Sequence, residues 1–214
     1  MSAKFLSNFE AIKPEPKLGD EPFVTPKGKL GFSVKDFWSW AFSDLLHNVT
    51  REWLAEFIVA RALGAINNVR DPWAAYDLDV PMEPGKPLKV EIKSAAYLQS
   101  WSQDRFSTIQ FDIKPTKSLN PETSKYDGPS VRHAEVYVFA LLRVKDKKLV
   151  SPLDTNQWDF YILPTYRLDD RTRSQDSITL NSFEDEMEVK AMSYDDLKNE
   201  VLKAGLINRK QLNT

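Results

Sequence analysis

The chain has 214 residues, of which 42% are hydrophobic and 28% are charged, and it contains no cysteine. This composition indicates a globular fold and excludes a disulfide framework and a thiolate zinc site. Because no apolar stretch is long enough to span a membrane and the N-terminus lacks a signal-peptide core, we expect a soluble cytoplasmic protein that does not contact membranes. The net charge of −2 neither favours nor excludes a nucleic-acid partner, since a basic groove can coexist with an acidic remainder.

The first 32 residues are predicted to form an extended arm, because they contain prolines and no helical periodicity. Residues 33–214 are then expected to form a single domain. Ser33 and Asp36 have the spacing of a capping box, which predicts a helix over Lys35–Leu46. Its aromatic side chains could stack on bases, but we favour core packing for them. These side chains are Phe37, Trp38, Trp40 and Phe42.

A second helix is predicted over Asn48–Gly64, where the final glycine suits a C-terminal cap. Within it, Glu56 lies at helical spacing from three apolar residues. A carboxylate in an apolar stripe is costly unless it is paired or bound to a metal. The alternative is a position at the edge of the helix, with Glu56 paired to Arg51. The three apolar residues are Trp53, Ala60 and Leu63.

Two segments that alternate apolar and charged residues, 76–80 and 90–94, predict a β-hairpin with its turn at Pro84-Gly85. Successive side chains of a strand point to opposite faces, so the apolar residues share one face and the charged residues share the other. The charged face is expected to hold Asp77, Asp79, Glu91 and Lys93.

The predicted register of this hairpin brings carboxylates together. Centring the turn on the proline places Asp77 opposite Glu91, and Asp79 opposite Lys89. Two carboxylates about 4 Å apart repel by roughly 4 kcal/mol at an effective dielectric of about 20. A partly buried pair therefore needs a cation, which Lys93 or a hard metal ion such as Mg²⁺ can supply. The alternative is a hairpin with one solvated face, on which alternating charges are ordinary.

Further elements are predicted downstream. Alternation predicts a strand over Ile109–Ile113, and an apolar run predicts a central strand, covered on both faces, over Ala134–Leu142. Another strand is predicted over Trp158–Leu163. A capping box at Ser193 predicts a closing helix that ends at Gly205.

Two polar segments are candidates for contact with nucleic acid. Residues Lys114–Gly128 predict a long polar loop, and loops of this length inside a domain are often functional. Residues Arg143–Lys148 form a basic turn, for which we favour a solvated connection. The only histidines are His47 and His133, too few for a metal site built from histidines.

The order of these charged residues resembles that of the PD-(D/E)XK nuclease superfamily, which includes restriction-endonuclease-like folds. The resemblance consists of a glutamate in a first helix, an aspartate on a strand, and a Glu-x-Lys tripeptide on the next strand. The resemblance covers residues 48–142, and the wording of the sequence there is similar to bacterial members of the group. Tyr76 replaces the proline that names the motif.

The resemblance implies a fold and a catalytic set. The fold is α/β, with a mixed central sheet flanked by helices and a restriction-endonuclease-like core over residues 33–214. The carboxylates would bind Mg²⁺, with Mn²⁺ as a substitute, while Asp79 stays open as an alternative ligand to Asp77. The implied catalytic residues are Glu56, Asp77, Glu91, Lys93 and Gln99, of which the first three are the metal ligands.

The function implied by the resemblance is metal-dependent hydrolysis of DNA phosphodiester bonds, as an endonuclease or exonuclease. DNA is then the expected partner, and a homodimer is one possible assembly. The first alternative is a catalytically inactive module with the same fold that binds nucleic acid or mediates assembly. The second is an interaction protein without a nucleic-acid role, which the acidic balance and the aromatic helix would suit.

Overall fold

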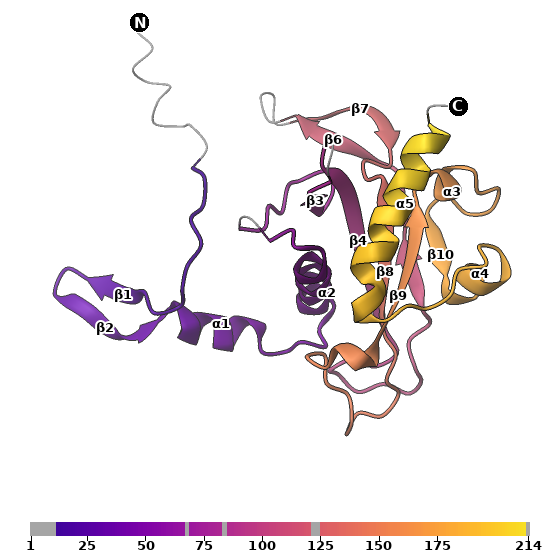
Figure 1. Ribbon diagram of the computed structural model, residues 1–214. Helices are drawn as coiled ribbons and strands as arrows, with labels where there is room; N and C mark the ends of the chain where they lie inside the picture. The colour runs from indigo at the N-terminus through magenta and orange to yellow at the C-terminus, as the bar shows by residue number, and fades with distance from the viewer. Residues whose placement is uncertain (1–11, 67–68, 83–84, 121–124, 213–214) are drawn as a thin grey trace, which may run out of the picture. The chain divides into compact units, whose positions relative to one another are not determined.

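A computed structural model describes residues 12–66, 69–82, 85–120 and 125–212 (Figure 1). The described chain forms two compact units. One comprises the described residues up to 43 together with 69–71, and the other comprises 44–66 and the described residues from 72 onward. The predicted boundary after residue 32 falls inside the first unit, where a strand passes into a helix.

The first unit contains a hairpin and a helix. Strand β1 (Pro22–Thr25) pairs antiparallel with β2 (Gly28–Ser33), and helix α1 (Val34–Phe42) follows directly. The predicted capping box is confirmed, because the Ser33 backbone N–H donates to Asp36 Oδ2 at 2.7 Å. The prediction that the aromatic residues of α1 pack in a core is wrong. No residue of this helix is buried, and Trp40 is 84% exposed, because a two-stranded hairpin offers too little surface to enclose it.

The second unit is built on a four-stranded sheet of mixed orientation. Its inner pair is parallel, and each outer strand runs antiparallel to its neighbour. Helices lie against the sheet, so the predicted α/β class with a mixed central sheet flanked by helices is confirmed (Figure 1). In spatial order the strands are β3 (Leu78–Val80), β4 (Leu88–Ala96), β8 (Val136–Leu142) and β9 (Trp158–Pro164).

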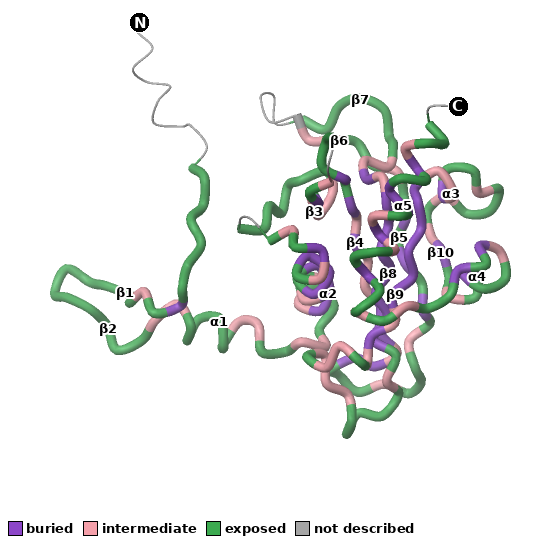
Figure 2. The backbone as a smooth tube through the Cα atoms, in the orientation of Figure 1, coloured by how far each residue is buried: buried purple, intermediate pink, exposed green. Residues whose placement is uncertain are grey.

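One face of this sheet is covered by the two long helices, α2 (Asn48–Leu63) and α5 (Leu197–Gln211). The predicted cap of α2 is confirmed, since Gly64 adopts the left-handed conformation with φ 67° and donates to Ala60 O and Arg61 O. Every residue of β8 is buried, as predicted for a central strand covered on both faces (Figure 2).

The helix α5 runs past Gly205, where the sequence predicted its end. A Cβ atom on Gly205 would lie 2.6 Å from the side chain of Leu88, so the glycine permits close packing of the helix on β4. The predicted capping box at Ser193 is confirmed and caps the short 3₁₀ turn Tyr194–Asp196 that leads into α5. Another 3₁₀ turn, Thr155–Gln157, precedes β9. None of the helices in the described chain is long and apolar enough to cross a membrane.

The other face of the sheet is covered by short elements, most of which the sequence did not predict. An aromatic cluster of Phe111, Phe139 and Phe183 fills the space between them and the sheet. The elements are β5 (Gln110–Asp112), its partner β10 (Ser177–Thr179), α3 (Tyr166–Asp169) and α4 (Leu180–Asp185). Of these four, only β5 was predicted from the sequence.

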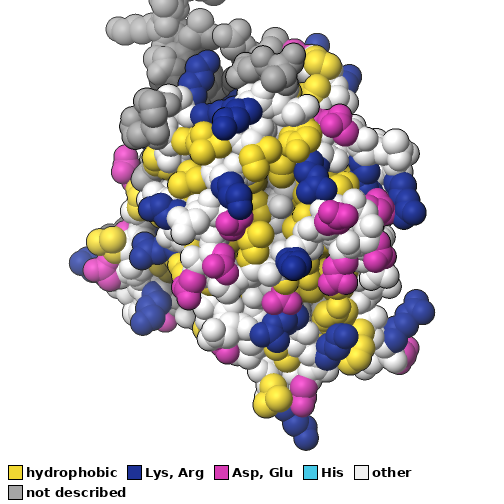
Figure 3. All heavy atoms as spheres, turned by 45° about the vertical axis from the view of Figure 1, so that its right-hand side comes forward, with side chains coloured by type: hydrophobic (Ala, Val, Ile, Leu, Met, Phe, Trp, Pro, Cys, Tyr) yellow, Lys and Arg dark blue, Asp and Glu magenta, His cyan; other side chains and the backbone are white. Residues whose placement is uncertain are grey.

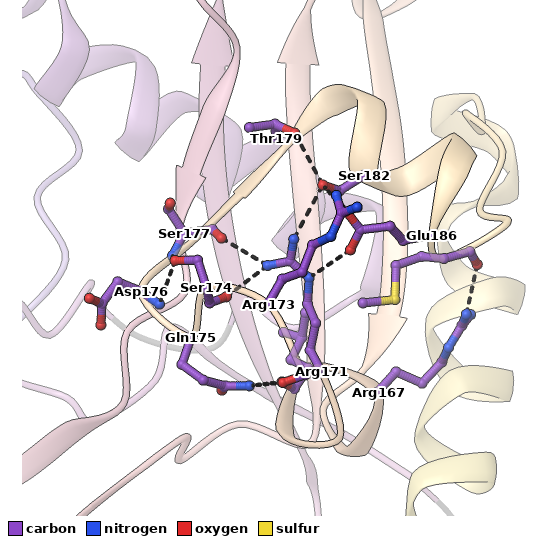
Figure 4. A network of polar contacts seen from close by, with 12 residues as sticks. Arg167, Arg171, Arg173, Ser174, Gln175, Asp176, Ser177, Thr179, Ser182 and Glu186 are labelled. Carbon is purple, nitrogen blue, oxygen red and sulfur yellow. Dashed lines mark hydrogen bonds and ion pairs between the residues drawn. The ribbon is translucent and has the colours of Figure 1, made fainter.

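A polar network holds these short elements in place (Figure 4). The guanidinium of Arg171 donates to the backbone oxygens of Ser174 and Ser177, and to the side chains of Ser182 and Glu186. Figure 4 shows Arg173 approaching the same glutamate, with which it forms an ion pair. One buried arginine therefore fastens the α3–β10 connection to α4.

The predicted long loop over Lys114–Gly128 is in fact part of a hairpin, so that prediction is wrong. Strand β6 (Thr116–Asn120) pairs antiparallel with β7 (Lys125–Val131). Every residue of β7 is exposed, and a hairpin that buries neither face needs no apolar alternation by which the sequence could reveal it. His133 Nε2 donates to Thr116 O at 2.9 Å, which ties this hairpin to the start of β8.

Candidate functional site

The candidate site lies at an edge of β4 that β3 leaves unpaired. The last contact of the ladder is the Asp77 N–H, which donates to Val90 O at 3.1 Å. Beyond it, the Ile92 N–H donates to Asp77 Oδ2 at 2.7 Å, and the Ser94 N–H donates to Glu52 Oε2 at 3.0 Å. Two carboxylates therefore occupy the place of a neighbouring strand and satisfy the backbone donors of β4.

The next pair of charges belongs to β4 itself. Lys93 Nζ lies 2.6 Å from Glu91 Oε1, with the two side chains 30% and 16% exposed. The pairing of Asp79 with Lys89 confirms the predicted register, and extending it by two residues brings Asp77 opposite Glu91. The proline on which the predicted turn was centred lies outside the described residues.

The helix α2 contributes Glu56, which is 6% exposed. Its charge raises the pKa of both Asp77 and Glu52, so it acts on the same site. The structure thus brings four of the five predicted residues into one region: Glu56, Asp77, Glu91 and Lys93.

Carboxyl groups outnumber basic groups in this region. Burial, followed by the charges of Glu91 and Glu56, raises the pKa of Asp77 well above its usual range. Burial also raises the pKa of Glu52 to about 7, although the charge of Lys93 and the Ser94 N–H act in the opposite direction. Burial lowers the pKa of Lys93, but the adjacent carboxylates outweigh it and the net shift is upward. Lys93 therefore stays protonated at neutral pH.

Glu52 is the residue of this site that the sequence analysis missed. It precedes Glu56 by four positions, so the two glutamates share one face of α2. That spacing was available in the sequence. The apolar neighbours at helical spacing single out Glu56 alone.

Gln99 lies behind the carboxylates and is not among them. Its Oε1 accepts from Arg51 Nη1 at 3.2 Å, and its Nε2 donates to Ser107 Oγ at 3.1 Å. Arg51 is itself buried and donates to Ser94 Oγ at 3.1 Å. These contacts connect Gln99 to the site through Arg51 and Ser94, so the amide supports the end of β4.

The site offers carboxylate oxygens, which are the ligand type that divalent hard cations take. The half-buried carboxyls of Asp77 and Glu52 hold their protons more tightly than exposed ones, chiefly because of desolvation. Across the described ranges, no three His, Cys, Asp or Glu side chains are grouped closely enough to hold a metal ion together. Asp79 is exposed and accepts a hydrogen bond from the Tyr76 hydroxyl at 3.2 Å, whereas Asp77 lies within the cluster.

Comparison with known proteins adds no relative to this picture. A scan against protein-family models finds no match, and a search of curated proteins finds no similar sequence. The resemblance to PD-(D/E)XK nucleases therefore rests on the types, order and placement of the residues themselves.

Proposed function

We propose that this protein is a metal-dependent nuclease that hydrolyses DNA phosphodiester bonds on a restriction-endonuclease-like core. The observation that carries the proposal is the concentration of carboxylates around Lys93 at the open edge of β4. Such an arrangement lowers stability, since burial and mutual repulsion raise the pKa of Asp77. Groups held against their electrostatic preference inside a site are candidates for function.

The residues have separate roles in the proposed reaction. Asp77 and Glu91 would hold Mg²⁺ or Mn²⁺, with Glu56 ordering its water or completing a second site. A bound divalent ion would lower the pKa of the attacking water and neutralise charge on the phosphate. Lys93, protonated at neutral pH, would stabilise the charge that develops on the phosphate in the transition state.

A second candidate function is a catalytically inactive module with the same fold that binds nucleic acid or mediates assembly. The observation that favours it is the ion pair of Lys93 with Glu91, which already neutralises one proposed metal ligand at 2.6 Å. Without a third ligand nearby, the remaining carboxylates would bind a cation weakly.

Substitution of Lys93 by alanine separates the two functions. We expect Lys93→Ala to slow Mg²⁺-dependent cleavage of DNA by roughly 10²–10³-fold, as expected when a preorganised charge is removed from a transition state. Single-turnover cleavage and thermal unfolding should be measured on one preparation. The matched control is Lys198→Ala, which removes an exposed lysine from α5 and should leave cleavage unchanged.

Two results would count against the nuclease. Equal metal-dependent cleavage by the wild type and by folded Lys93→Ala would identify a contaminating enzyme or a different site. No cleavage of duplex, single-stranded or branched DNA, together with no Mg²⁺ or Mn²⁺ binding by calorimetry, would favour the inactive module.

A further inference from the structure

A groove opens at the end of the central sheet where β4 and β8 begin. It has a volume of about 630 Å³, and its walls come from the start of β4, the segment before β8, the start of α3 and the end of α5. Four lysine and arginine side chains line it against two acidic ones, so its charge is positive even with neutral histidine. The basic residues are Lys86, Lys89, Arg132, His133 and Arg209.

This groove leads toward the candidate site. A smaller cavity of about 70 Å³ is lined by Glu91 and Lys93, together with Lys114 and Tyr137. His133 lines both the groove and this cavity. The histidine therefore marks the junction between a basic surface and the carboxylate cluster.

The cations of the groove fall into two kinds. Arg132 and Arg209 are held in place by ion pairs of 2.6 Å, with Asp169 and Glu135 respectively. Arg209 also donates to the backbone oxygens of residues 86 and 87, so it fixes the wall that carries Lys86. Among the described residues, Lys86 and Lys89 form no ion pair, and both are exposed. The Lys89 ammonium lies 5.0 Å from the centre of the Tyr76 ring, a contact that leaves N–H groups able to donate to an anion.

Basic side chains are also visible on the molecular surface. Figure 3 shows several lysine and arginine side chains at the upper end of the face it presents, with fewer acidic side chains among them. The rotation between the two views is about the vertical axis, so this upper end corresponds to the C-terminal end of α5 in Figure 1. Arg209 belongs to that end of the helix.

We infer that this groove binds the sugar–phosphate backbone of the DNA strand that enters the site, with Lys86 and Lys89 contacting phosphates and His133 at the entrance. That the ligand is DNA rests on the proposed function. The position of the binding surface and the choice of the two lysines rest on the groove and its charges. Lysine suits this role because its ammonium is a point charge that contacts phosphate without demanding one geometry. Such contacts release counterions, so the binding must depend on salt.

The test is a binding measurement that does not require catalysis. The variant Lys86→Gln/Lys89→Gln removes both lysines of the groove, and Lys190→Gln/Lys198→Gln removes two exposed lysines away from it as a matched control. Fluorescence anisotropy with a labelled oligonucleotide, single-stranded and as a duplex, should be recorded in EDTA over a series of salt concentrations. We expect the groove variant to bind about tenfold more weakly at low salt and to lower the salt slope by about two, one for each lost phosphate contact.

The outcomes distinguish the groove from the nuclease. An unchanged affinity in the groove variant, or an equal loss in the control variant, would overturn the groove. Loss of binding in the groove variant alone, in a wild-type protein that cleaves no DNA with Mg²⁺, would support the groove and contradict the nuclease. Cleavage that persists at the wild-type rate in the groove variant at sub-saturating DNA would support the nuclease and contradict the groove.

Discussion

Two charged regions of the second unit, the one built on the four-stranded sheet, use the same residue types with opposite effects on stability. Around Glu186, two arginines and a serine hydroxyl converge on one carboxylate. Burial opposes its ionisation, but the hydrogen bond from Ser182 and the charges of Arg171 and Arg173 together lower the pKa of Glu186. This region gains stability from its charges.

At the edge of β4 the balance is reversed. Several carboxylates surround one ammonium, and the pKa values of Asp77 and Glu52 are raised. Packing and backbone hydrogen bonds hold these groups together although their charges repel. The comparison teaches that ion pairing alone does not mark a functional region, and that an arrangement which costs electrostatic energy is the better indicator.

The largest expected effect on stability concerns the network around Glu186. Arg171 is 6% exposed and donates to four partners, so Arg171→Met leaves the backbone oxygens of Ser174 and Ser177 without this donor and removes one of the two arginines paired with Glu186. Loss of one partner of a buried pair costs about 3 kcal/mol or more in the free energy of unfolding. Urea denaturation at neutral pH measures this change. A loss below about 1 kcal/mol would mean that the network contributes little, as exposed ion pairs do.

At the edge of β4, we expect the removal of a charge to raise the free energy of unfolding. Glu52→Gln keeps an oxygen for the Ser94 N–H and removes a charge, so we expect the metal-free variant to be more stable than the wild type above pH 7. A carboxyl whose pKa is about 7 in the fold and 4.5 when unfolded binds its proton more tightly in the fold. Wild-type stability therefore falls as pH rises between these two values, by at most about 3 kcal/mol.

Denaturation in EDTA at several pH values tests this prediction. The difference between Glu52→Gln and the wild type should be small near pH 4 and should grow up to about pH 8. The control is Glu200→Gln, which removes a partly exposed carboxylate on α5 that pairs with Lys203. A Glu52→Gln protein that is less stable than the wild type at every pH would show that this charge is compensated in the fold.

The sequence predicted the elements whose pattern reflects burial. The alternation in β4 follows its one apolar face, and the uninterrupted apolar run of β8 follows its two covered faces. The register of β3 on β4 followed from alternation and the turn, and it brought Asp77 near Glu91 as predicted. The core of the sheet and most of the carboxylate cluster could therefore be predicted from local sequence patterns.

Other parts depend on contacts that no local pattern reveals. The strand β10 pairs with β5 across a long separation in the chain, and its three residues are too few to show a period. A glycine near the end of a helical pattern predicts a helix end, but Gly205 serves close packing against Leu88. That packing depends on the tertiary fold and leaves no local signal. The role of Glu52 was not predicted, because it depends on the unpaired edge of β4, which only the structure reveals.

The smallest expected effect belongs to Arg173, which shares Glu186 with Arg171 but is 71% exposed. Solvent screens its charge, and ordering a long exposed side chain costs conformational entropy. Arg173→Ala should therefore change the free energy of unfolding by no more than about 0.5 kcal/mol, as for other surface ion pairs. Measuring Arg171→Met, Arg173→Ala and the double variant under one set of conditions isolates their coupling through the shared glutamate. If Arg173→Ala cost as much as Arg171→Met, charge rather than burial would determine the strength of this network.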